Sequence, residues 1–230
     1  MTLDVGGVLT LPPVDELLRS HGLPAMAEAM LVAHHAAVTV EDGLLAQRGD
    51  EAVDGFGAER HAYYRAFAAA MGAPHDALVR VVDALAEMAI REMPWTLAAP
   101  GALQVIADLN SAEVPVAIVS NSNGTVEAQL RDMGICQRGP GPLPHVAAVI
   151  DSAIVGVRKP HPQIFDPALD ALGVDRHSVV HVGDTVAFDV AAALAAGITP
   201  IHYDASGTCT GDHAHITRLA KLVTLVDARS

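Results

Sequence analysis

Two carboxylates, Asp184 and Asp189, lie in a loop that follows the β-branched run 179–180 and precedes an alanine-rich segment, 191–196. This pattern predicts a strand, a loop and then a helix that ends at Gly197. Acids that lie close together repel each other unless a positive charge lies between them, and hard divalent cations prefer oxygen ligands. The loop therefore predicts a cation site. Simple stabilisation of a helix N-terminus by nearby acids is the alternative.

Further polar positions stand in predicted loops: Asp4, Ser120 with Asn121, and Lys159. Asp4 precedes two adjacent glycines, which allow a tight turn and a close approach of the backbone to a ligand. Loops at the carboxyl ends of neighbouring parallel strands meet in one crevice, so these groups are expected to meet. Such a set suits a phosphoryl group. A cation and the lysine neutralise its oxygens, the hydroxyl orients it, and the carboxylate attacks.

The elements that must position these groups fall into two patterns. Between residues 12 and 95 the pattern is helical, without strand-like runs, and predicts helices at 14–20, 25–38, 58–71 and 76–91. After Gly101, short apolar strands alternate with helices, and a last helix is predicted near 213–222. We therefore predict a three-layer α/β core with a doubly wound parallel sheet from 1–11 and 96–230, and an inserted α-helical cap at 12–95.

Composition limits the possible partners. The 230 residues carry a formal net charge of −13, which argues against nucleic-acid binding through a basic surface. We expect neither a membrane span nor a signal peptide, because no apolar run is long enough and the chain enters directly into structure. Cys136 and Cys209 form no metal-like or redox-like pair motif, so we expect ordinary thiols in a reduced, cytoplasmic setting. The alanine-rich chain is compatible with a monomer or a homodimer.

At this point the motifs resemble a known family. Taken in order, Asp4-Val5-Gly6-Gly7-Val8-Leu9, Ser120-Asn121, Lys159-Pro160 and Gly183-Asp184…Asp189 are similar to the four motifs of the haloacid dehalogenase-like (HAD) hydrolases. The helical insert after the first motif resembles the helical-cap branch of that family. The resemblance implies a Rossmann-like core and a hydrolase, most simply a phosphatase that acts on a small phosphorylated metabolite.

The resemblance also implies roles for particular residues. Asp4 would be the nucleophile and would form an aspartyl-phosphate. Ser120 and the Asn121 backbone would hold phosphoryl oxygens, while Lys159 would balance the charge on Asp4 and the phosphate. Mg²⁺ would be held by a set of ligands that bind directly or through water: Asp4, the Gly6 carbonyl, Asp184 and Asp189.

Gly6 departs from the family pattern, because phosphatases of the family usually carry a second Asp there as general acid and base. General acid–base catalysis contributes ~10²–10⁴ in rate, so substrates with poor leaving groups should turn over slowly. Val8 likewise replaces an expected Thr. His34 and His35 in the cap are alternative proton suppliers, although we expect ordinary surface or core side chains there.

Other activities fit the sequence less well. A 2-haloacid dehalogenase also attacks through an Asp but needs no cation and usually lacks the acidic pair. A phosphonatase would need a cap lysine, and none occurs between residues 12 and 100. A bacterial receiver domain fits less well, because its acidic pair lies on the first strand. A dinucleotide-binding domain also fits less well, because the spacing of Gly6 and Gly7 does not match that of a dinucleotide loop. The main non-enzyme alternative is a regulatory HAD-like protein that binds a phosphorylated ligand with little turnover.

The cap sequence does not select a substrate, and we expect solvent or subunit contacts for most of its polar cluster: Arg60, His61, Tyr63, Tyr64 and Arg65.

Overall fold

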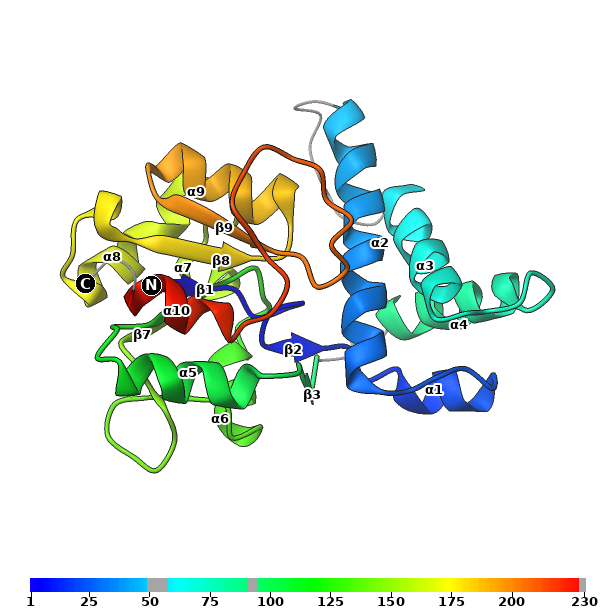
Figure 1. Cartoon of the computed structure of the whole chain (residues 1–230), viewed down its shortest axis with the longest axis horizontal. Helices are drawn as coiled ribbons and strands as arrows, with labels where there is room; N and C mark the ends of the chain where they lie inside the picture. Colours follow the sequence, from blue (N-terminus) through cyan, green and yellow to red (C-terminus); the bar gives the residue numbers. More distant parts are fainter. Residues whose placement is uncertain (49–57, 91–94, 228–230) are drawn as a thin grey trace.

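The computed structural model describes residues 1–48, 58–90 and 95–227 of the chain. Its central strands are β1 (Thr2–Leu3), β4 (Ala117–Ser120), β7 (Ala148–Asp151), β8 (Val180–Gly183), β9 (Thr199–Tyr203) and β10 (His215–Ile216). They form one sheet in the order β10-β9-β8-β1-β4-β7 (Figure 1). Every pairing between these strands is parallel. The carboxyl ends of the strands therefore lie along one edge of the sheet.

The two faces of the sheet are covered by different helices. On β4, Ala117 and Val119 pack in one buried cluster with α8 (Asp166–Leu172) and α9 (Ala191–Ala196). Ile118 points the other way and packs in the cluster that contains α5 (Ala102–Ser111). Alternate residues of a strand face opposite sides, so this division shows two helical layers around one sheet. The predicted α/β fold is confirmed.

The remaining core elements are short. They are α6 (Val126–Asp132), α7 (Ser152–Val155), α10 (Lys221–Asp227), the 3₁₀ turns Pro162–Phe165 and Arg176–Ser178, the π turn Val186–Val190, and a two-stranded parallel sheet of β5 (Gln137–Arg138) and β6 (His145–Val146). Helices separate β4, β7, β8 and β9, as the sequence predicted, whereas β5, β6 and β7 follow one another without a helix, and β10 follows β9 in the same way.

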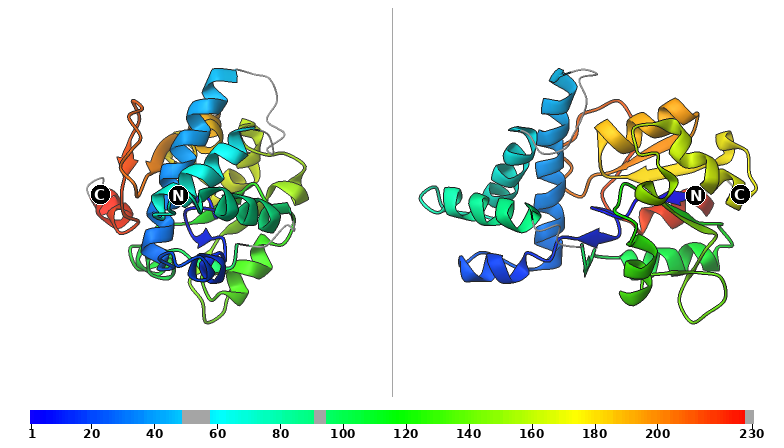
Figure 2. Two further views of the ribbon diagram at one scale, coloured as in Figure 1. Left: turned by 90° about the vertical axis from the view of Figure 1, so that its right-hand side faces the viewer. Right: turned by 180° about the vertical axis from the view of Figure 1, so that it is seen from behind.

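The helical segment that follows β1 and precedes α5 lies to one side of the sheet in Figure 1 and in the right-hand view of Figure 2. It contains α1 (Asp15–Ser20), α2 (Ala27–Arg48), α3 (Ala58–Ala70) and α4 (Leu78–Ile90). Its two connections to the core run together, because β2 (Thr10–Leu11) pairs antiparallel with β3 (Leu97–Ala98). The division into a core and a cap at 12–95 remains a prediction.

Helix α2 is longer than the 25–38 segment that the sequence indicated. It continues through Gly43, a weak helix former, because its second half contacts the core. There the Asp42 carboxylate accepts hydrogen bonds from the backbone N–H groups of Val186 (2.7 Å) and Ala187 (3.0 Å). Across the described ranges, no helix combines the length and the apolar character that crossing a bilayer would require.

The helix predicted near 213–222 is wrong for residues 213–220. The chain there forms the edge strand β10, and α10 begins only at Lys221. Ile216 is buried against the core, and its neighbour His215 pairs with His202 of β9. Pairing with the open edge of β9 therefore outweighs the local helical pattern.

Candidate active site

Adjacent strands β8, β1 and β4 end in residues that the sequence analysis singled out. Asp4 follows β1 directly, Ser120 is the last residue of β4, and Asp184 follows β8 directly. Because these strands are parallel neighbours, their ends lie side by side. All three side chains are buried, and all three line one cavity.

Lys159 brings a positive charge between two carboxylates. Its Nζ lies 2.8 Å from Asp4 Oδ1 and 2.6 Å from Asp189 Oδ1, and it donates to the Val119 carbonyl at 3.2 Å. The residue is only 1% exposed. Burial opposes the charge, but Asp189 and Asp4 outweigh it and raise the pKa of Lys159 above its ordinary value. The ammonium is therefore charged at neutral pH.

Asp189 is held by contacts to both of its oxygens. Oδ1 contacts His181 Nε2 at 2.9 Å as well as Lys159, and Oδ2 accepts from the backbone N–H (3.1 Å) and the hydroxyl of Thr185. Burial acts to raise the pKa of Asp189, but Lys159 and His181 hold it well below its usual range. Gly183 permits this packing, since a Cβ there would lie 2.1 Å from Asp189 Cγ. Asp189 is ionised and anchors Lys159, so contact with a metal through water fits it better than direct contact.

Asp184 is reached from the helical segment by His34. His34 Nε2 lies 2.8 Å from Asp184 Oδ2, and His34 Nδ1 lies 2.6 Å from the Tyr63 hydroxyl. Burial, with the nearby Arg60 charge, lowers the pKa of His34 to about 3, so the ring is neutral. A neutral ring that accepts from Tyr63 at Nδ1 carries its proton on Nε2, where it donates to Asp184. Gly7 leaves room for this contact, because its Cβ would lie 2.2 Å from Asp184 Oδ2.

The oxygen atoms of this site fit a magnesium ion. One oxygen from each of Asp4, Asp184 and Asp189 lies within 4.8 Å of the other two. Burial raises the pKa of Asp4 to about 6, which a cation would oppose. No described residue donates a well-directed hydrogen bond to the buried Asp4 Oδ1, although Lys159 forms an ion pair with it. Hard oxygen donors that converge in this way suit Mg²⁺.

The Ser120–Asn121 loop has two different tasks. The Asn121 side chain brackets the backbone of Lys159: Nδ2 donates to the Lys159 carbonyl at 2.9 Å, and Oδ1 accepts from the Lys159 N–H at 2.8 Å. Ser120 is 4% exposed and lines the cavity. Asn121 therefore positions the lysine through its side chain, which leaves its own backbone beside the cavity.

Gly6 faces the indole ring of Trp95, which the sequence analysis did not single out. A Cβ on Gly6 would lie 3.2 Å from Trp95 Cζ3. The same ring packs edge-on against His34, with ring centroids 5.2 Å apart. Trp95 thus occupies space that a larger side chain at position 6 would enter.

The cavity has a volume of about 800 Å³ and lies between the sheet edge and helices α2 to α4. A volume of this order suits a small molecule. Arg60, Tyr63 and Tyr64 line it, whereas His61 and Arg65 are exposed. The expectation of solvent or subunit contacts is therefore wrong for three of the five residues in the cap cluster.

Two further residues tie the helical segment to the site. His35 is buried and bridges the Gly7 carbonyl (2.8 Å) and the Ala205 N–H (2.6 Å), so it is a core histidine. Asp42 caps the turn that carries Asp189 by accepting from Val186 and Ala187, and the sequence analysis missed it. The predicted helix ended at residue 38, so the sequence analysis did not place Asp42 on a helix. The contacts of His35 with Ala205 and of Asp42 with Val186 join residues more than a hundred positions apart in the sequence.

Comparison with known proteins places the chain among hydrolases. A family described as "Hydrolase: haloacid dehalogenase-like hydrolase" matches residues 1–197. "Haloacid dehalogenase-like hydrolase domain-containing protein 3" from Danio rerio is 35% identical over 95 residues, which is 41% of this chain and 39% of that protein. The protein of the same name from Xenopus laevis is 31% identical over 104 residues, 45% of this chain and 39% of that protein. The matches thus span well under half the length of these relatives.

Solved structures share the fold at low identity. The HAD-hydrolase YfnB from Bacillus subtilis, described as bound to magnesium, has a TM-score of 0.59 and 16% identity, with 98% of this chain and 97% of that chain covered. A 2-haloacid dehalogenase from Pseudomonas syringae has a TM-score of 0.54 and 20% identity, with 100% and 98% covered. A HAD phosphatase from Thermococcus onnurineus has a TM-score of 0.52 and 18% identity, with 98% and 96% covered. Both phosphatases and dehalogenases therefore share this architecture.

Proposed function

Because the chain belongs to the haloacid dehalogenase-like hydrolases, we propose that it hydrolyses small phosphomonoesters with Asp4 as the nucleophile and with Mg²⁺ as cofactor. The observation that carries the proposal is the buried set of Asp4, Asp184 and Asp189 around the Lys159 ammonium. A dehalogenase that attacks through an Asp needs no cation, so a set of oxygen ligands favours phosphate chemistry. The cavity above the set has room for a small metabolite.

The residues divide the reaction between them. An Asp4 oxygen forms a bond to phosphorus while the bond between phosphorus and the ester oxygen breaks, and the ester oxygen leaves with the electron pair. Lys159 and the Ser120 hydroxyl stabilise the negative charge on the phosphoryl oxygens. Asp4, Asp184, the Gly6 carbonyl and Asp189 would hold Mg²⁺, which would supply further positive charge there. In the second step a water oxygen forms a bond to phosphorus, the bond between phosphorus and Asp4 breaks with its electron pair on Asp4, and inorganic phosphate leaves with the protons of the water.

The leaving oxygen must take a proton, and we expect this proton transfer to limit the rate. Gly6 offers no carboxyl group, and the neutral His34 is committed to Asp184 and Tyr63. Phenolic leaving groups depart without a proton more readily than alkoxides do. We therefore expect p-nitrophenyl phosphate to be hydrolysed much faster than sugar or alkyl phosphates. Equal rates for the two classes would show that another group supplies the proton.

Gly6 also favours one alternative, a protein that binds a phosphorylated ligand without useful turnover. Phosphate release from p-nitrophenyl phosphate that requires Mg²⁺ and is abolished in Asp4→Asn would establish the enzyme. Binding of BeF₃⁻ that Asp4→Asn abolishes, together with no phosphate release, would establish the binding protein. Release of halide from a 2-haloacid without Mg²⁺ would instead show a dehalogenase.

The remaining parts of the proposal concern context. We infer a cap at residues 12–95 that selects the substrate, a monomer or homodimer, and a cytoplasmic location. Among the residues lining the cavity, Arg60 is the cationic side chain contributed by the cap. It also contacts Glu41, with Nε 3.3 Å from Oε1. Arg60 is therefore the residue that we expect to select for a second anionic group on the substrate.

A further inference from the structure

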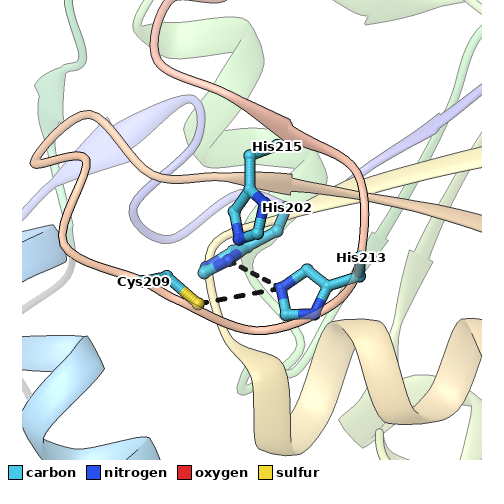
Figure 3. A group of neighbouring side chains, drawn as sticks. All are labelled: His202, Cys209, His213 and His215. Carbon is cyan, nitrogen blue, oxygen red and sulfur yellow. Dashed lines mark hydrogen bonds between the residues drawn. The ribbon is translucent and has the colours of Figure 1, made fainter.

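Four side chains that bind soft metals gather at the edge of the sheet, outside the cavity. They are His202, Cys209, His213 and His215 (Figure 3). One nitrogen or sulfur atom from each lies within 4.8 Å of those of the other three. His202 is buried, Cys209 and His213 are half-buried, and His215 is exposed. The group is thus open to solvent on one side.

Two distances within the group are close to the edges of a tetrahedral site. His202 Nδ1 lies 3.1 Å from His213 Nε2, and Cys209 Sγ lies 3.8 Å from His213 Nε2. With ordinary zinc–ligand bond lengths, tetrahedral coordination gives about 3.4 Å between two nitrogens and about 3.6 Å between nitrogen and sulfur. A single ion would therefore need only a few tenths of an ångström of adjustment at these edges.

The sheet itself brings two of the histidines together. His202 lies on β9 and His215 opens β10, and the two are direct partners in the register of this strand pair. Partners across a strand pair point to the same face. Their ring centroids are 5.2 Å apart, and those of His213 and His215 are 4.4 Å apart. The backbone thus fixes the spacing of the imidazoles.

Cys209 is also positioned in advance. The Asp204 carboxylate accepts from the backbone N–H groups of Ser206 (3.0 Å), Gly207 (3.0 Å) and Cys209 (2.8 Å). These bonds fold the loop after β9 back on itself, so that the thiol faces His213 (Figure 3). A preorganised loop loses little conformational entropy when it binds an ion.

His202 shows the outer contact that is typical of metal ligands. Its Nε2 donates to the Asp184 carbonyl at 2.8 Å, which leaves the Nδ1 lone pair directed at His213 and Cys209. A ligand histidine almost always donates its other ring N–H in this way, which fixes its tautomer and orientation.

We propose that His202, Cys209, His213 and His215 bind one Zn²⁺ ion, which clips the loop after β9 to the edge strand β10. Zinc prefers thiolate and imidazole ligands in a tetrahedral set of four, whereas Mg²⁺ prefers oxygen ligands, and this set offers none. With all four positions filled by protein, the ion is structural. It also stabilises the position of Asp184, because His202 donates a hydrogen bond to the Asp184 carbonyl.

Cobalt substitution tests the site directly. In the full-length protein, Co²⁺ should produce a thiolate-to-cobalt charge-transfer band together with the intense visible bands of tetrahedral cobalt, and Zn²⁺ should bleach both. Cys209→Ala should lose the charge-transfer band. Cys136→Ala is the matched control, because Cys136 is the other cysteine and is buried in the core; it should keep the spectrum.

Metal content provides the second measurement. Protein equilibrated with Zn²⁺ and gel-filtered should carry one zinc ion at this site. The variant His215→Ala, a change at an exposed position, should lower the affinity for zinc by more than the ~10–100-fold that loss of an outer-shell partner costs. His145→Ala, at another exposed histidine, should leave zinc retention unchanged. Absence of the cobalt band from the parent protein, or its persistence in Cys209→Ala, would overturn the proposal. So would zinc retention that His215→Ala leaves unaltered.

Discussion

Two groups of side chains with metal-ligating atoms lie on either side of the Asp184 backbone, and they differ in chemistry and in construction. On one side, oxygen atoms of Asp4, Asp184 and Asp189 surround a buried lysine. On the other, imidazoles and one thiol lie between β9 and β10, and His202 holds the Asp184 carbonyl. The first group is assembled from loops far apart in the sequence, and the second from fourteen consecutive residues, 202–215.

The difference shows how one sheet edge can support two tasks. Buried carboxylates around a cation attract a hard ion and an anionic substrate, so that group is suited to catalysis. The second group has four neutral or soft ligands and is suited to hold a strand in place. Changes that act on only one of the two groups test whether they are separate.

The largest effect is expected for Asp4→Asn. Loss of the nucleophile should reduce phosphate release from p-nitrophenyl phosphate by ~10³-fold or more, about 4 kcal/mol of barrier. The cobalt spectrum of the second group should not change. An Asp4→Asn protein that retains the parent rate would place the activity elsewhere.

Lys159→Met should act on stability rather than on the second metal group. Removal of the ammonium leaves Asp4 and Asp189 buried without their partner, which should cost about 3–5 kcal/mol in the free energy of unfolding. Lys221→Met is the matched control at an exposed position and should cost less than ~0.5 kcal/mol. Urea unfolding measures both, and similar losses would show that the buried ion pairs are unimportant.

Introducing a carboxyl group at position 6 should raise the rate of alkyl phosphate hydrolysis. Gly6→Asp alone brings its Cβ to 3.2 Å from the Trp95 ring, so we expect the full effect only in the double variant Gly6→Asp with Trp95→Ala. That variant should hydrolyse alkyl phosphates ~10²-fold faster than Trp95→Ala alone, at the lower end of the range of general acid–base catalysis. No difference between the two would mean that proton supply does not limit the parent enzyme.

Magnesium should stabilise the protein through the first group only. At about 100 times its dissociation constant, a ligand that binds only the folded state adds ~2.7 kcal/mol to stability. Thermal unfolding should show this increment in the parent and in Cys209→Ala, and little of it in Asp184→Asn. If Mg²⁺ stabilised Asp184→Asn as much as the parent, magnesium would not bind at the acidic site.

The smallest expected effect is on pH dependence without metal. The pKa of Asp4 is raised from its ordinary value to about 6, so its protonated form favours the folded state. The stability contributed by that proton is complete below the unfolded pKa and is lost as pH rises through about 6. Between pH ~4 and ~7 the parent should therefore lose about 1–3 kcal/mol relative to Asp4→Asn. Parallel curves for the two proteins in urea unfolding would contradict this assignment.

The order of the motifs was enough to predict the α/β fold. The sequence also indicated Asp4 and Asp184, because they follow strands directly and parallel strands align their ends, and it indicated Lys159 in a loop that precedes a helix. It did not indicate the contact of His34 with Asp184 or of Trp95 with Gly6. These contacts depend on how the helical segment packs against the sheet, which local patterns do not encode.

The histidine–cysteine group was missed for a different reason. A helix at 213–222 would place His213 and His215 on different faces, since residues two apart on a helix point in nearly opposite directions. In the structure a bend precedes the short strand β10, and both rings face His202. The pairing of β10 with β9 decides this, and it is a long-range choice that the local sequence obscures.

Covalent capture at Asp4 tests the central claim most directly. With ³²P-labelled p-nitrophenyl phosphate and Mg²⁺, rapid acid quenching during turnover should leave phosphate on the peptide that contains Asp4, and none in Asp4→Asn. The peptides around Ser120 and Asp184 should carry no label. Turnover without labelling of Asp4, or labelling of another residue, would contradict the account.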